Sequence, residues 1–115
     1  MRYLLTVYGD ESTSGSLSEQ EDKAEQDAFA AFEREAGEAG VLAANAGLRS
    51  EPRTLSLQGG TRQVSDGGVT GPQERMGCFY ILDCRDQADA EAWASKIPLV
   101  GAGGFHSIEI RQVLE

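Results

Sequence analysis

The distribution of apolar residues along the chain predicts a sheet with at least two interior strands. Residues 3–8 (YLLTVY) and 77–84 (GCFYILDC) are apolar at successive positions. In an extended chain this places apolar side chains on both faces, as in interior strands. Residues 77–84 are the most apolar run, so we expect this strand at the centre of the sheet. Residues 107–113 are predicted to form the last strand.

A long helix is predicted after residue 17. Ser18 and Glu21 have the spacing of a capping box, in which each side chain accepts a hydrogen bond from the backbone N–H of the other residue. The helix is expected to run from Glu19 to about Ala39, since Gly40 suits the left-handed conformation that ends many helices. Its apolar stripe consists of Phe29, Phe32, Ala36 and Ala39.

A second helix is predicted after the central strand. Asp86 can cap its first turn through the carboxylate, and Pro98 ends the helical pattern after Ile97. The side of this helix that we expect to be buried carries Ala90, Trp93, Ala94 and Ile97.

Two short strands are predicted between the first helix and the central strand. Residues 54–57 and 61–65 flank Gly59 and Gly60, a pair that tolerates positive φ at both positions of a two-residue hairpin turn. Because their alternation is weak, we expect an edge hairpin or a partly exposed ribbon. Residues 41–53 are rich in Ala and Gly and remain ambiguous.

This order of elements predicts one α+β domain spanning residues 1–115. Strand, helix, hairpin, central strand, helix and strand are typical of a ferredoxin-like antiparallel sheet with both helices on one face. A chain of 115 residues builds only a modest core. The other face of the sheet would stay uncovered, so we expect it to pack against a second copy of the chain, as a homodimer.

The charge and the cysteines narrow the classes of function and compartment. The net charge of −9 disfavours nucleic-acid binding and anionic membranes, and no apolar run is long enough for a signal peptide or a membrane span. Cys78 and Cys84 would lie about 20 Å apart along one strand, too far for a disulfide. We therefore expect a cytoplasmic protein with reduced thiols. No residue spacing indicates a metal or another cofactor.

His106 is the only histidine and the first candidate for acid–base chemistry. A general base needs a carboxylate that orients one ring nitrogen while the other faces the substrate. Asp66 or Asp10 could supply that carboxylate if the ends of the strands meet. The favoured interpretation is simpler: His106 enters a strand partly exposed, Asp66 forms a turn with Gly67, and Asp10 forms a turn at a strand end.

Tyr8 and Tyr80 are candidates for lining a pocket, because each offers a hydroxyl group on an aromatic ring. Core packing is the favoured interpretation for both residues. Cys78 and Cys84 are expected to be inert buried thiols, and the acids of the long helix to form a solvated face.

Several segments resemble YCII-related proteins, specifically the branch named after its DGPF motif. The resemblance implies a ferredoxin-like fold paired into a dimeric α+β barrel, in a largely uncharacterised family of which some members are encoded beside sigma factors or fused to them. The matching segments, in the family's order, are Met1–Glu11, Ala39–Leu42, Ser65–Gly67, Gly77–Leu82 and Ser107–Arg111.

The motif itself departs from the family pattern. Asp66 and Gly67 are present, but Gly68 and Val69 replace the Pro-Phe pair. Further along, the family's acidic residue and lysine are replaced by glycine at 71 and glutamine at 73, whereas the following glutamate is kept at 74. The loop keeps its length, so if it forms a ligand site in the family, its chemistry here is altered.

Two functions are compatible with this sequence. The first is a dimeric small-molecule-binding protein with a pocket between the sheet and the 66–76 loop, in which Tyr8, Asp10, Asp66 and Tyr80 bind the ligand. Asp66 and His106 would supply any weak acid–base activity, and these polar side chains should then converge on one cavity. The second is a non-catalytic dimerisation or regulatory module that contacts a protein partner through an exposed apolar patch.

Overall fold

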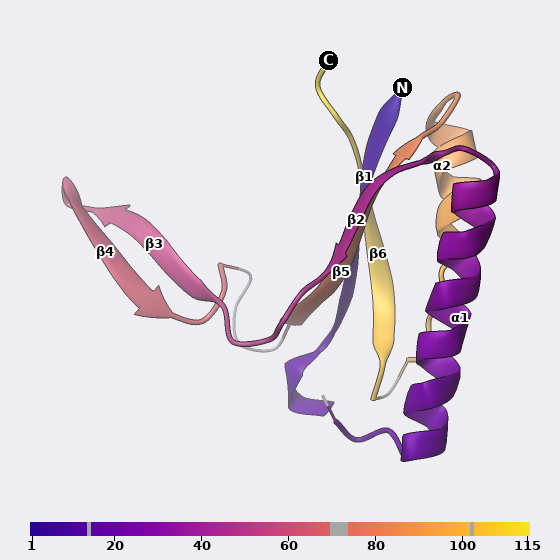
Figure 1. Cartoon of the computed structure of the whole chain (residues 1–115). Coiled ribbons are helices and arrows are strands. Elements are labelled where there is room, and N and C mark those ends of the chain that lie inside the picture. The colour runs from indigo at the N-terminus through magenta and orange to yellow at the C-terminus, as the bar shows by residue number, and fades with distance from the viewer. Residues whose placement is uncertain (14, 70–73, 102) are drawn as a thin grey trace.

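The computed structural model of the protein describes residues 1–13, 15–69, 74–101 and 103–115. It contains six strands, two α-helices and a short 3₁₀ turn in this described part. Figure 1 shows a four-stranded sheet between two helices on one side and a projecting hairpin on the other. The elements are β1 (Arg2–Asp10), the 3₁₀ turn (Glu11–Thr13), α1 (Glu19–Glu38), β2 (Leu42–Gly47), β3 (Arg53–Gln58), β4 (Thr61–Asp66), β5 (Glu74–Asp83), α2 (Gln87–Ala94) and β6 (Phe105–Gln112).

The main sheet has the strand order β2-β5-β1-β6, with antiparallel pairing throughout. Strands β1 and β5 are therefore interior, as their apolar sequences predicted. With the hairpin set aside, this order agrees with the ferredoxin-like arrangement expected from the sequence. A register shift between Val7 and Tyr8 places Gly77 opposite no residue of β1, as at a β-bulge.

The core lies between the helices and one face of the sheet. On β1 this face carries Tyr3, Leu5 and Val7, which are almost fully buried. Phe32 of α1 joins the layers, because its ring makes edge-to-face contacts with Tyr80 of β5 and Trp93 of α2. The remaining buried apolar residues are Ala36, Leu82, Cys84, Ala90, Ala94 and Ile97.

The predicted helix ends are largely confirmed. Ser18 Oγ accepts from the Glu21 N–H at 3.1 Å, and Glu21 accepts from the Ser18 N–H at 3.1 Å. Gly40 has φ 74° and Asp86 caps α2 as expected. Two details differ. Ala39 is exposed, because it caps the helix instead of facing the sheet, and α2 ends at Ala94 in a tighter turn.

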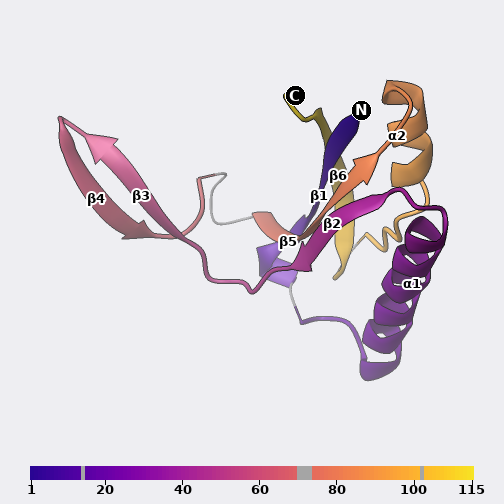
Figure 2. The same cartoon turned by 45° about the horizontal axis from the view of Figure 1, so that its top comes forward.

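The ambiguous stretch 41–53 contains a strand that the sequence did not reveal. Strand β2 pairs with the edge of β5 and completes the four-stranded sheet. The predicted hairpin forms a separate two-stranded sheet of β3 and β4, in agreement with the second of the two predicted options, a partly exposed ribbon. Gly59 and Gly60 both have positive φ in its turn, as predicted. Figure 2 shows that this hairpin points away from the main sheet, on the side opposite the helices.

Candidate functional site

A cavity of about 610 Å³ lies between α1 and the adjoining part of the sheet; we call it the α1 groove. Residues of α1 form one wall, and residues of β2, β5 and β6 form the other. Both acidic and basic side chains line the groove. Those on which the argument depends are Glu25 and Glu33 from α1, Arg49 from the segment after β2, Arg75 and Tyr80 from β5, and the ring of Phe105 from β6.

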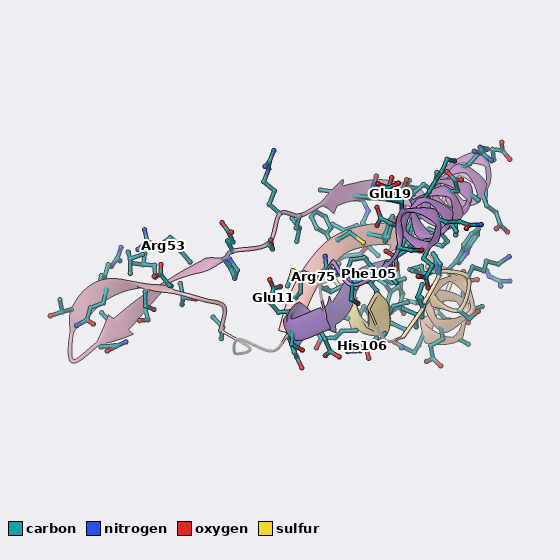
Figure 3. The ribbon with its side chains drawn as sticks, turned by 90° about the horizontal axis from the view of Figure 1, so that it is seen from below. Glu11, Glu19, Arg53, Arg75, Phe105 and His106 are labelled. Carbon is teal, nitrogen blue, oxygen red and sulfur yellow. The ribbon has the colours of Figure 1, made fainter. Side chains whose placement is uncertain are left out.

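Arg75 is held against an aromatic ring instead of a carboxylate. Its guanidinium carbon lies 4.6 Å from the centre of the Phe105 ring, a cation–π contact, and Figure 3 shows these two side chains close together. The Nε atom of Arg75 is buried without a hydrogen-bond partner. No described carboxylate forms an ion pair with Arg75 within 4 Å. Its charge therefore has no ion-pair partner among the described residues, although it lowers the pKa of the nearby Glu25.

Glu25 faces the same groove with one unsatisfied oxygen. The backbone N–H of Phe105 favours the charged form of this carboxylate, but Oε2 is buried without a hydrogen-bond partner. Burial raises the pKa of Glu25 above its ordinary value, and the Phe105 N–H only partly offsets this effect. Glu25 can approach so closely because Gly104 has no side chain: a Cβ there would lie 2.5 Å from Oε2.

Glu33 and Tyr80 form the polar end of the groove. The Tyr80 hydroxyl donates to Glu33 Oε1 at 2.9 Å, and Asn45 Nδ2 donates to the same oxygen at 3.4 Å. Burial, reinforced by the neighbouring Cys78 and Glu33, raises the pKa of Tyr80, so this tyrosine stays protonated as a hydrogen-bond donor.

A second cavity, of about 420 Å³, lies between the sheet and the described ends of the 66–76 loop. It shares Leu48, Arg49 and Arg75 with the α1 groove, so Arg75 stands at the junction of the two. The sequence predicted a ligand pocket between the sheet and this loop, but none of the residues predicted for it lines this cavity. Glycine 71 and glutamine 73, where the motif departs from the family, lie outside the described residues.

The structure brings Asp10 and His106 together, although they are 96 residues apart. His106 Nε2 lies 3.2 Å from Asp10 Oδ1, and His106 Nδ1 lies 2.8 Å from Ser107 Oγ. Both ring nitrogens thus lie within hydrogen-bonding distance of protein groups. Tyr8 and His106 line a separate cavity of about 380 Å³.

Asp66 and Tyr80 lie away from that pair. Asp66 is on the hairpin, where it pairs with Arg53 at 3.2 Å and leaves its side chain 95% exposed. Tyr80 faces the core side of the sheet and the α1 groove, whereas Tyr8 lines the cavity beside His106. Asp66 lines a further cavity of about 490 Å³ at the base of the hairpin. Tyr8 and His106 thus share one cavity that Asp66 does not line, so the structure does not bring Asp66 together with Asp10, Tyr8 and His106.

The charged residues of the α1 groove were missed at the sequence level. Glu25 and Glu33 belong to an acidic helix face that we interpreted as solvated, and Arg75 was assigned no role. A usable signal was present for one of them. Gly77 lies two residues after Arg75, and a glycine in an otherwise apolar strand indicates that another group approaches the backbone closely. Here that group is the Phe105 ring, which Arg75 contacts.

Comparison with known proteins agrees with the resemblance in the sequence. The family model for the YCII-related domain matches residues 1–114. The chain belongs to the YCII-related family. It is also 32% identical over 92 residues to an uncharacterised protein of Rhizobium meliloti (strain 1021), a match that covers 78% of this chain and 74% of that protein.

Two further observations concern the described residues of this YCII-related chain. They contain no cluster of three or more His, Cys, Asp or Glu side chains able to hold a metal ion. Neither described helix is both long enough and apolar enough to cross a membrane.

The two free thiols should react slowly with a disulfide reagent such as DTNB. Burial raises the pKa of Cys78 to about 11 and also raises that of Cys84. A raised pKa leaves less thiolate at a given pH, and the thiolate is the reactive form. We expect the native reaction of Cys78 to accelerate up to about pH 11, and both thiols to react rapidly in denaturant. Fast labelling of native protein at pH 8 would contradict this prediction.

Proposed function

We propose that this YCII-related protein is a homodimer that binds a small organic carboxylate in the α1 groove. The ligand would also carry an amino or hydroxyl group, as amino acids and hydroxy acids do. The observation that carries this proposal is the pair of unsatisfied, oppositely charged atoms, Arg75 Nε and Glu25 Oε2, in one groove.

The charge arrangement sets the orientation of the ligand. Arginine binds carboxylates through two parallel N–H groups, so the ligand carboxylate lies on Arg75, with Arg49 beside it. The amino or hydroxyl group donates to Glu25 or Glu33 on the opposite wall. Leaving buried polar atoms unpaired costs free energy, and both atoms are closed off from solvent. In the proposed complex the two side chains turn toward the groove, where a ligand with both groups satisfies them.

The volume and the position of the groove support the same ligand class. A volume of about 610 Å³ is within the range of small-molecule sites. Because the groove meets the cavity at the 66–76 loop around Arg75, the rest of a longer ligand would extend toward that loop.

The uncovered face of the main sheet supports the homodimer. Leu4 pairs with Ile81 and Thr6 with Phe79 on this face, opposite the helices, and the apolar members of these pairs are only partly buried. Two such faces packed together would give the dimeric α+β barrel that the resemblance implies. A chain that stays monomeric at high concentration in sedimentation equilibrium would contradict this part of the proposal.

Acid–base activity has less support. Among the residues selected from the sequence, only Asp10 and His106 lie within hydrogen-bonding distance of each other. Both ring nitrogens already face protein groups, so our proposal assigns no reaction. The alternative, a regulatory module that contacts another protein, draws its support from the exposed apolar residues of the hairpin. It does not account for unsatisfied charges inside a groove.

The ligand proposal is tested by thermal shift with amino acids, hydroxy acids and their methyl esters. An acid that binds should raise the melting temperature, since a ligand at 100 times its dissociation constant adds about 2.7 kcal/mol to the free energy of unfolding. The methyl ester of the same compound should leave the melting temperature unchanged, because it has no carboxylate to pair with Arg75.

Substitutions assign the shift to the groove. Arg75→Met should abolish it, whereas Arg34→Met removes an arginine that does not line the groove and should leave it unchanged. Glu25→Gln should reduce the thermal shift caused by amino acids more than the shift caused by hydroxy acids, because only amino acids carry a positive charge. A flat response to all these acids, or equal shifts for acids and esters, would overturn the proposal.

A further inference from the structure

One face of the β3–β4 hairpin carries three exposed apolar side chains together with Arg53, Arg62 and Asp66, and no described residue buries the apolar ones. Alternate residues of a strand point to opposite faces. Leu55 lies opposite Val64 on one face, and Leu57 lies on the same face. These three side chains are 61%, 55% and 70% exposed, in that order. The other face is wholly polar and carries Thr54, Ser56, Gln58, Thr61, Gln63 and Ser65.

Hydrogen bonds hold the base of the hairpin, whereas its two strands pair only with each other. The Gly67 N–H donates to the Pro52 carbonyl at 2.9 Å, and Thr54 Oγ1 donates to the Gly67 carbonyl at 2.7 Å. Beyond these bonds the two strands extend alone from the body (Figures 1 and 2). An isolated two-stranded hairpin is at best marginally stable in water, so its apolar face requires a partner surface.

The direction and the charge of the hairpin both favour a second copy of this chain. The hairpin extends on the side of the open sheet face, where the dimer proposed above places the second subunit (Figure 1). Residues 53–66 contain Arg53, Arg62 and Asp66, a net charge of +1, so the rest of the chain carries −10. A weakly basic ribbon and an acidic body attract each other.

We propose that the hairpin of each subunit packs its apolar face against the body of the partner subunit. This inference rests on the proposed homodimer. In a two-fold dimer the contact occurs twice, once for each hairpin, so both hairpins hold the two subunits together. We call these two contacts the clasp. Burying the three apolar side chains between subunits removes the exposure that a monomer cannot avoid.

Sedimentation equilibrium of the full chain tests the clasp. The triple variant Leu55→Thr, Leu57→Thr, Val64→Thr removes the apolar face but keeps residues that favour strands. Its dimer dissociation constant should rise by at least about tenfold, as expected for residues central to an interface. The matched control, Ser56→Thr, Gln63→Thr, Ser65→Thr, changes the polar face of the same strands and should leave the constant within about threefold of the wild type.

A deletion of the hairpin tests the same contact independently, in case the triple variant fails to fold. Two glycines in place of residues 53–66 can join Pro52 to Gly67, whose backbone groups are already hydrogen-bonded, and this deletion should weaken the dimer at least as much. If the wild type is a dimer and neither change weakens it, the clasp is overturned while the homodimer stands. A monomeric wild type overturns both, and the ligand shift is measured separately from either result.

Discussion

Replacing Phe32 with alanine should lower the free energy of unfolding by about 3–5 kcal/mol. The ring is 3% exposed and lies 5.0 Å from the Tyr80 ring and 6.4 Å from the Trp93 ring, centre to centre. It thus contacts both the sheet and the second helix. Its removal leaves a cavity where three elements meet. The loss is large because the whole free energy of unfolding of a small domain is only about 5–15 kcal/mol.

Urea unfolding at fixed protein concentration measures this loss, because the proposed dimerisation would make the apparent stability depend on concentration. Leu114→Ala is the matched control, since Leu114 is 98% exposed, and it should change the stability by less than about 0.5 kcal/mol. A loss below about 1 kcal/mol for Phe32→Ala would show that α1 does not pack as described.

The second large effect is expected at Gly77. A Cβ at this position would overlap the ring of Phe105, so Gly77→Ala must displace that ring. The ring also makes an edge-to-face contact with Phe29 at 5.8 Å and lies under the Arg75 guanidinium. We expect a loss of about 1–3 kcal/mol, the usual cost of overpacking, together with a weaker ligand shift because Arg75 loses its support.

Gly47→Ala is the control for this substitution. Gly47 also lines the α1 groove and pairs with Cys78, but a Cβ there would meet no atom within 4 Å. Urea unfolding and thermal shift should therefore distinguish the two alanines. Equal stability and equal ligand response in both variants would contradict the described position of the Phe105 ring.

Local signals account for what could be predicted about the fold. The capping box at Ser18 and Glu21 and the turn at Gly59 and Gly60 depend on neighbours a few residues away, and all formed as expected. Strand β2 was missed because its sequence, LAANAG, has small residues without clear alternation. It becomes a strand by pairing with β5, and this long-range contact leaves no local pattern.

The candidate site depends even more on long-range contacts than the fold does. Arg75 and Glu25 come from a strand and a helix about fifty residues apart, and Phe105 from a third element, so their shared groove has no sequence spacing to detect. The pair Asp10 and His106 was foreseen as one option because both lie near strand ends. Asp66 was not brought to it, because β4 belongs to the projecting hairpin and not to the main sheet.

The sequence by itself determined the two helices, the interior strands, the hairpin turn and the family, because caps, turns and apolar periodicity act within a few residues. Only the tertiary structure decided which charged side chains share a groove and which apolar faces stay uncovered. Both depend on the pairing of distant strands and on the side from which the helices approach, and these follow from packing of the whole chain.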